Sequence, residues 1–149
     1  MKTSSILIIS TVLTALSTTF FVVADEPSSK VNITTLKHIM QGLLRDTQAL
    51  TQGIFFEDFQ LIEQAAKRIA DHPTADLSIK MKLIGNLGAD MSRFKKLDKQ
   101  VHDIALDIRK AAIQQDMSTT IIGYHKLIDG CQSCHSNFKQ PVSKLLSQD

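Results

Sequence analysis

Both cysteines of the chain lie in one short stretch, Cys131-Gln-Ser-Cys134-His135. On a helix, residues three and four apart share a face, so the two thiols and the imidazole would point to one side. The spacing C-x-x-C-H is the attachment signature of a c-type haem, in which two thiols bond to the haem edge and the histidine reaches the iron. The sequence therefore predicts one haem c, covalently attached through Cys131 and Cys134, with His135 as an axial iron ligand.

Three other chemistries use a cysteine pair at this spacing. A disulfide would close only a very small loop and would leave the adjacent His135 unexplained. A structural zinc site needs about four ligands, and the sequence has no second Cys/His pair at a suitable spacing. A thioredoxin-like dithiol opens a helix after a strand, whereas this motif lies deep in the last helical segment. Haem attachment accounts for more of the motif than any of these.

The N-terminal stretch has the pattern of a secretory signal peptide. Lys2 precedes an apolar run that continues to Val23, and small residues mark a cleavage site that we place after Ala24. A transmembrane anchor is the alternative, because the run is about as long as a membrane span. However, Ser and Thr interrupt it and no basic stop-transfer cluster follows. We therefore expect residues 1–24 to be cleaved and the mature domain, 25–149, to be periplasmic without stable membrane insertion.

The charge balance gives no indication of nucleic-acid binding. The whole chain carries 17 Lys and Arg against 15 Asp and Glu. This balance is close to neutral, and no basic run is long enough to follow a phosphate backbone.

Helical periodicity dominates the rest of the chain. Apolar residues recur at three-and-four spacing along four segments, and no segment has a convincing strand pattern. We expect a first helix capped by Thr34 or Thr35, and a second that begins at Glu57 or Asp58 and ends at Asp71-His72-Pro73. A third helical region should cover 78–115, with a break between Gly85 and Gly88. A fourth helix should cover 118–139 and end at Pro141. These segments predict an all-α fold, an antiparallel four-helix bundle with up-down-up-down topology.

An exported four-helix bundle with C-x-x-C-H near the end of its last helix resembles the cytochrome c′ family over the whole mature chain. Phe138 and Lys139 after the motif are similar to the family pattern of an aromatic residue and then a base. The resemblance implies that Lys139 lies near the proximal histidine or a haem propionate. The alternative for Lys139 is a solvated lysine in the last helical turn, where a cation suits the helix dipole.

The family divides at the sixth iron position. In one branch an apolar side chain leaves this position open and the haem binds gases such as NO; in the other a methionine from the first helix fills it. Met40 is about five residues into the first helix and His135 about five before the end of the fourth, which is the same depth in an antiparallel bundle. Met40 is also in line with the apolar Leu36 and Leu43. We expect Met40 to be the sixth ligand, with Met91 the next candidate and Met81 and Met117 after it. The alternative for Met40 is a flexible core methionine.

The expected function is that of a periplasmic electron carrier, which exchanges single electrons with redox partner proteins and transforms no substrate itself. Two alternatives stay open: a gas-binding protein with an open distal site, and a bundle without haem that carries a disulfide. No acid/base or nucleophilic constellation apart from the haem motif indicates an enzyme. The resemblance also implies that a homodimer can form through the first two helices, where three aromatic residues are candidates for contacts: Phe55, Phe56 and Phe59.

Overall fold

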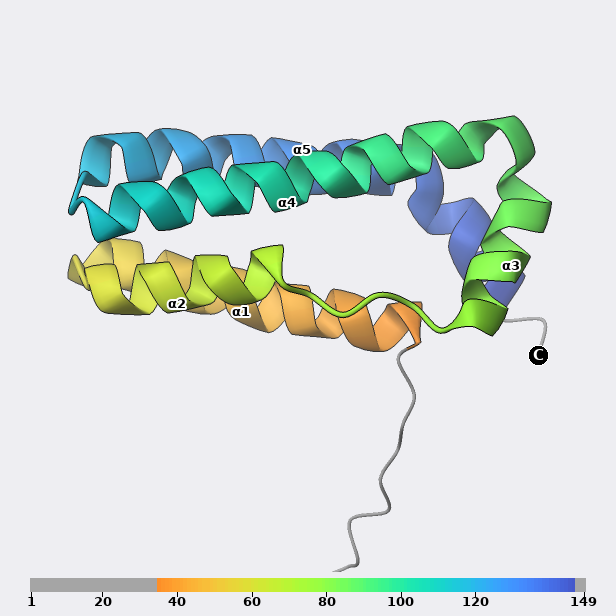
Figure 1. Cartoon of the computed structure of the whole chain (residues 1–149), viewed down its shortest axis with the longest axis horizontal. Coiled ribbons are helices and arrows are strands. Elements are labelled where there is room, and N and C mark those ends of the chain that lie inside the picture. Colours follow the sequence, from red (N-terminus) through yellow and green to blue (C-terminus); the bar gives the residue numbers. More distant parts are fainter. Residues whose placement is uncertain (1–34, 147–149) are drawn as a thin grey trace, which may run out of the picture. The chain divides into compact units, whose positions relative to one another are not determined.

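The computed structural model describes residues 35–146 and is all-helical in this range, with no strand (Figure 1). The elements are α1 (Leu36–Phe56), α2 (Phe59–Ala70), α3 (Leu77–Leu87), the short 3₁₀ helix η1 (Gly88–Asp90), α4 (Met91–Ile113) and α5 (Met117–Leu146). The expected all-α fold class is confirmed. The expected signal peptide, 1–24, lies outside the described residues. No helix within 35–146 is both long and apolar enough to cross a membrane.

Polar side chains begin the first two helices where the sequence predicts. The Thr35 hydroxyl accepts a hydrogen bond from the backbone N–H of His38 at 3.2 Å, and the Asp58 carboxylate accepts one from Leu61 at 2.9 Å. Each of these bonds satisfies an N–H group that the first turn of a helix leaves without a partner. The expected starts of both helices are therefore confirmed.

The third helical region is broken near its glycines, as expected. α3 ends at Leu87, Gly88 has a φ of +49°, and η1 leads into α4 at Met91. Glycine adopts a positive φ without the steric cost that a Cβ would bring. A short helix followed by a long one is thus confirmed.

The end of α5 differs from the expectation, because the helix continues through Pro141 to Leu146. The prediction that Pro141 ends the helix was wrong. A proline inside a helix costs about 3 kcal/mol, but the residues beyond it bury apolar surface. Val142 is buried and lies in one cluster with Leu83 of α3, and Leu145 packs against that cluster. Each fully buried side chain of this size contributes about 1.5–3 kcal/mol, which offsets the loss at the proline.

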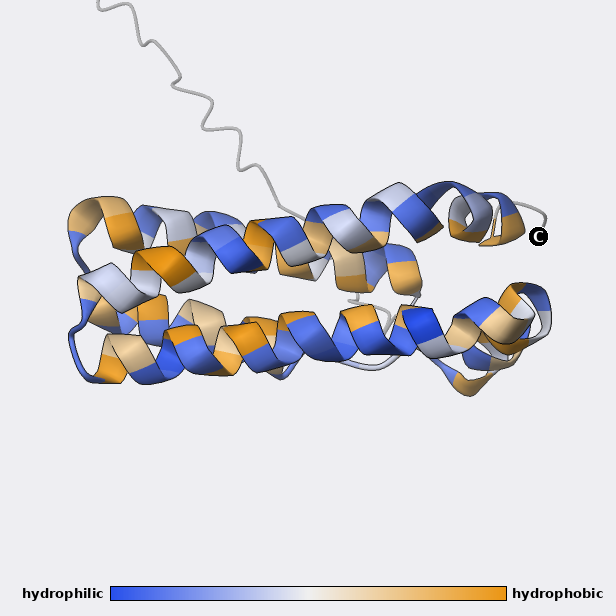
Figure 2. Cartoon of the chain, turned by 90° about the horizontal axis from the view of Figure 1, so that it is seen from above, coloured by the Kyte–Doolittle hydropathy of each residue, from blue (hydrophilic) through white to orange (hydrophobic). Residues whose placement is uncertain are grey.

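Two apolar clusters hold the helices together. The larger joins α1, α2, α4 and α5 through fully buried side chains, among them Leu50, Ile62, Ile108 and Leu127. Figure 2 shows apolar and hydrophilic residues alternating along the helices, as expected for amphipathic helices with one buried face.

Of the three aromatic residues considered for a homodimer, Phe59 packs against the larger cluster, whereas Phe55 and Phe56 are exposed. The homodimer through α1 and α2 stays a prediction.

The second cluster surrounds Leu83 of α3 and Phe138 of α5, and Cys134 packs against it. The rings of Phe94 on α4 and Phe138 meet edge to face, with 5.4 Å between their centroids. This geometry is one of the two that aromatic pairs prefer. The haem motif therefore lies beside the apolar cluster that joins α3, α4 and α5.

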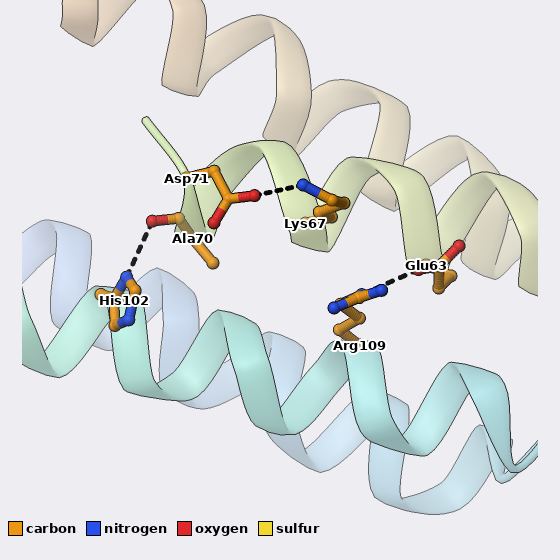
Figure 3. Close-up of polar contacts among 6 residues, drawn as sticks. All are labelled: Glu63, Lys67, Ala70, Asp71, His102 and Arg109. Carbon is orange, nitrogen blue, oxygen red and sulfur yellow. Dashed lines mark hydrogen bonds and ion pairs between the residues drawn. The ribbon is translucent and has the colours of Figure 1, made fainter. Parts of the chain in front are cut away.

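Polar contacts tie α4 to α2 (Figure 3). Arg109 Nε donates a hydrogen bond to Glu63 Oε1 at 2.8 Å, and His102 Nδ1 lies 2.7 Å from the carbonyl oxygen of Ala70. The carbonyl groups in the last turn of a helix have no partner within the helix, so His102 satisfies one of them at the end of α2. These contacts fix α2 against the long helix α4.

The helix pairs of the domain are packed to very different degrees. α1 packs closely on α2, α2 on α4 and α4 on α5, whereas α1 touches α5 at few places. Figure 1 shows α4 and α5 side by side as one pair, with α1 and α2 as the other. The interface between α1 and α5, called the α1–α5 seam below, is the sparsely packed one.

Candidate haem site

The three residues of the haem motif lie on the long helix α5. Cys131 and Cys134 are half-buried, His135 is exposed, and neither cysteine forms a disulfide. Cys134 packs against Phe138 and its cluster. Because the two thiols are three residues apart on one helix, they lie about 60° apart around it and about one turn apart along it. This arrangement suits two bonds to one edge of a flat group.

Burial raises the pKa of both thiols above its ordinary value of 9.0. Loss of solvation is the main cause at each cysteine, because it disfavours the thiolate. At Cys134 the negative charge of Asp98 and the neighbouring Cys131 raise the pKa further. A redox-active C-x-x-C pair relies on a thiol whose pKa is lowered. The surroundings of this pair therefore disfavour a thioredoxin-like role.

One hydrogen bond fixes how α1 faces α5. The hydroxyl groups of Thr51 and Tyr124 lie 2.9 Å apart across the α1–α5 seam. Eleven residues make about three turns of an α-helix and span about 16 Å along its axis. The residue eleven positions before Thr51 is Met40, and the residue eleven positions after Tyr124 is His135. Each of the two candidate ligands is thus on the same helix face as one partner of this hydrogen bond.

Most of the residues that continue these two faces are apolar and at least partly exposed. On α1, Met40 is 36% exposed and Leu44 is 59% exposed; on α5, Ile128 is 40% exposed and Cys131 is half-buried. They are four, seven or eleven residues from the hydrogen-bonded pair, so each shares its helix face. The α1–α5 seam therefore presents apolar side chains from both helices that residues 35–146 do not cover. A flat apolar group bound there would cover them, so these residues fit a haem.

The two candidate methionines lie in different surroundings. Met91, on α4, packs against the cluster that also contacts Cys134. Met40 is in neither apolar cluster and lies on the face of α1 that carries Thr51. The assignment of the sixth ligand therefore stays a prediction, with Met40 on the seam and Met91 in the cluster.

Lys139 is exposed on α5, one turn after His135. Residues four apart share a helix face, so Lys139 lies on the same side of α5 as His135. Its expected place near a haem propionate stays a prediction.

The sequence analysis missed an ion pair beside the motif. His72 Nε2 lies 3.5 Å from Asp98 Oδ1, and His72 Nδ1 lies 3.2 Å from the carbonyl oxygen of Pro73. The hydrogen bond to Asp98 raises the pKa of His72 above its ordinary value, while partial burial acts in the opposite direction. Asp98 also acts on Cys134. No local pattern could have predicted this pair, because its members come from distant parts of the chain.

Within residues 35–146, no group of three or more His, Cys, Asp or Glu side chains is placed to hold a metal ion. A haem differs from a bare ion, since the porphyrin supplies four nitrogen ligands and the protein only the axial ones. In comparisons with known proteins, no family model, curated protein or solved structure matches the chain. The resemblance to cytochrome c′ therefore stays a prediction from the motif and the helix pattern.

Proposed function

We propose that the protein is a periplasmic c-type cytochrome that carries single electrons between redox partner proteins. One haem would be bonded to Cys131 and Cys134, with His135 and Met40 as the two axial ligands. The observation that carries this proposal is that the C-x-x-C-H motif borders a sparsely packed, apolar seam between α1 and α5. When bound, the haem iron would accept and release one electron, and methionine ligation would raise its reduction potential.

We infer that the domain is an antiparallel bundle with up-down-up-down topology. The turns at Glu57–Asp58 and Gln114–Asp116 are too short for the chain to do more than reverse between α1 and α2 and between α4 and α5. The ribbons of α1 and α5 in Figure 1 are drawn in opposite directions, in agreement with this topology. The start of α1 would then lie at the same end of the bundle as the end of α5.

The register of the α1–α5 seam supports Met40 and His135 as a ligand pair. Met40 lies eleven residues before Thr51, and His135 lies eleven residues after Tyr124. If α1 and α5 are antiparallel, both steps run in the same direction along the bundle axis. They would bring Met40 and His135 to the same level, about 16 Å from the hydrogen bond between Thr51 and Tyr124. At 100° per residue, each candidate ligand lies only about 20° around its helix from that bond. This register supports the proposal that His135 and Met40 would hold the haem iron between α5 and α1.

The other seam residues would bind and shield the haem. Leu44 and Ile128 are large, apolar and exposed, and covering apolar surface stabilises a complex by about 25 cal/mol per Å². Cys131 would hold one haem edge at the seam, and Cys134 would hold it against the cluster around Phe138. Lys139 would pair with a propionate one turn beyond His135. These residues bind and orient a cofactor, and none of them is given a role in transforming a substrate.

A gas-binding cytochrome with an open sixth position is the second candidate. The observation in its favour is the position of Met40, which is partly exposed and belongs to neither apolar cluster. A thioether that is not held by packing is less pre-organised as a ligand. In this alternative Met40 would form only an apolar lid, and NO or CO would bind to the iron.

Absorption spectra of the holoprotein and two variants test the ligand pair. We expect a low-spin ferric spectrum for the natural protein and a high-spin spectrum for Met40→Ala, with rapid CO binding to its ferrous form. Met81→Ala is the matched control, because Met81 is an exposed methionine on α3, and it should stay low-spin. A high-spin natural protein that Met40→Ala leaves unchanged would exclude Met40 and favour gas binding. A change in Met91→Ala alone would assign the ligand to Met91.

A further inference from the structure

The end of the domain that carries the haem motif is basic. α3, η1, the start of α4 and the end of α5 come together there (Figure 1). Residues 76–99 and 131–146 contain eight Lys and Arg and three Asp, a net charge of +5. The other described residues, 35–75 and 100–130, contain seven Lys and Arg and nine Asp and Glu, a net charge of −2. The near-neutral total therefore conceals a strong asymmetry of charge.

α3 presents an exposed apolar stripe at this basic end. Leu77 is 73% exposed, Met81 59% and Ile84 44%. They are four and three residues apart, so they lie on one helix face. A different face of α3 carries Leu83, which is buried against Phe138 of α5. The packing of Leu83 anchors α3 to the domain, and the α3 stripe of Leu77, Met81 and Ile84 is exposed on another face of the helix.

We propose that the α3 stripe and the basic residues around it form a docking surface for an acidic protein partner. Protein interfaces commonly have an apolar centre with a polar rim. Lys95 and Lys96 are exposed on the first turns of α4, and the proposal assigns them to this rim. Opposite charge accelerates encounter and fixes orientation. That the partner exchanges electrons rests on the proposed function, whereas the docking surface itself rests on charge and exposure.

A membrane surface is the competing occupant, and the composition of α3 disfavours it. Helices that lie on membranes use large aromatic and aliphatic residues over a long apolar face. α3 has 11 residues and no aromatic side chain, and the chain has no tryptophan. The short stripe with charges of both signs nearby is better suited to a protein.

Two synthetic peptides of equal negative charge can probe the surface. One is a poly-glutamate peptide, and the other has a leucine at every third or fourth position. Amide chemical shifts of the ¹⁵N-labelled protein report where each peptide binds, and titration gives its Kd. We expect both peptides to shift amides of α3 and the start of α4, with the leucine peptide binding at least threefold more tightly. Salt should weaken both.

Charge reversal at the two ends of the domain provides a matched comparison. Lys95→Glu/Lys96→Glu and the control Lys110→Glu/Lys126→Glu change exposed lysines and alter the net charge equally. We expect the first pair to weaken both peptides at least tenfold and the control to weaken them less than twofold. If both double variants lose affinity equally, net charge alone explains the attraction of the peptides, and the proposal is overturned.

A second comparison tests the apolar stripe. Leu77→Ser/Met81→Ser should remove the advantage of the leucine peptide, whereas Phe55→Ser/Ile113→Ser, which changes exposed apolar residues elsewhere, should keep it. An advantage that survives the α3 variant would overturn the role of the stripe. The natural protein could instead bind phosphatidylglycerol vesicles more tightly than the leucine peptide. If Leu77→Ser/Met81→Ser abolishes that vesicle binding, the stripe is a membrane-binding surface and the proposal is overturned. Peptide binding does not depend on the sixth iron ligand, so a failed ligand assignment is distinguishable from a failed docking surface.

Discussion

A glycine on α5 sets how closely this helix approaches α4, and Gly123→Ala tests that spacing. A Cβ at Gly123 would lie 2.6 Å from Cγ1 of Ile108. Ile108 is fully buried in the larger cluster, so any movement of its side chain is against other core residues. The added methyl group must therefore separate the two helices or shift the core between them.

The expected magnitude follows from two opposing effects. Alanine is about 1 kcal/mol more favourable than glycine within a helix, whereas overpacking a core costs about 1–3 kcal/mol. Gly123→Ala should therefore range from neutral to about 2 kcal/mol less stable. Gly85→Ala is the matched control, because a Cβ at Gly85 meets nothing within 4 Å. It should be about 0.5–1 kcal/mol more stable than the natural protein, so the two variants should differ by about 0.5–3 kcal/mol.

Urea unfolding of both variants, followed by circular dichroism of the helices, measures this difference. The midpoint of Gly85→Ala should rise and that of Gly123→Ala should fall below it, with unchanged slopes. If the two variants are equally stable, α4 and α5 are not as closely packed at Gly123 as described, and the argument from steric overlap is refuted.

Two further predictions concern polar contacts. Tyr124→Phe should lower the free energy of unfolding by about 0.5–1.5 kcal/mol, because it removes the hydrogen bond to Thr51. Thr51 Oγ1 can still donate to the Thr47 carbonyl oxygen at 2.8 Å. Unchanged stability would contradict a role for the Thr51–Tyr124 bond in the α1–α5 seam. Asp98 raises the pKa of His72 above 6.5, so their pair contributes stability that is fully present below the unfolded pKa of His72 and is lost as pH rises through its folded pKa. Asp98→Asn should remove this pH-dependent contribution, which is under about 1 kcal/mol because Asp98 is largely exposed. The same variant should lower the pKa of His72 in an NMR titration. An unchanged pKa of His72 would exclude the pair.

Local chemistry made much of the fold predictable. The caps at Thr35 and Asp58 follow from side chains that bond to free N–H groups within the next few residues. The break before α4 follows from the backbone freedom of glycine, which a short stretch of sequence is enough to show. The haem motif is likewise local, since its residue types and spacing lie within five consecutive positions.

Features that depend on distant partners could not be predicted. Pro141 should end a helix by local rules, but burial of Val142 against α3 keeps the helix going. The pairing of His72 with Asp98 depends on where the segment after α2 lies against α4. His135 was expected about five residues before the end of its helix, and this was wrong, because α5 continues to Leu146, 11 residues beyond His135. The contact that sets the register of α1 against α5 could not be predicted either, because it depends on the packing of the whole bundle.

The central claim is that Cys131 and Cys134 together hold one haem, and intact-mass spectrometry tests it most directly. The full chain would be expressed together with haem-maturation machinery, and the same measurement would be made on Cys131→Ser/Cys134→Ser. We predict the mass of residues 25–149 plus one haem for the natural protein, and the mass of the chain alone for the variant. A natural protein with the mass of the bare chain, or with the loss of two hydrogens that marks a disulfide, would contradict the account.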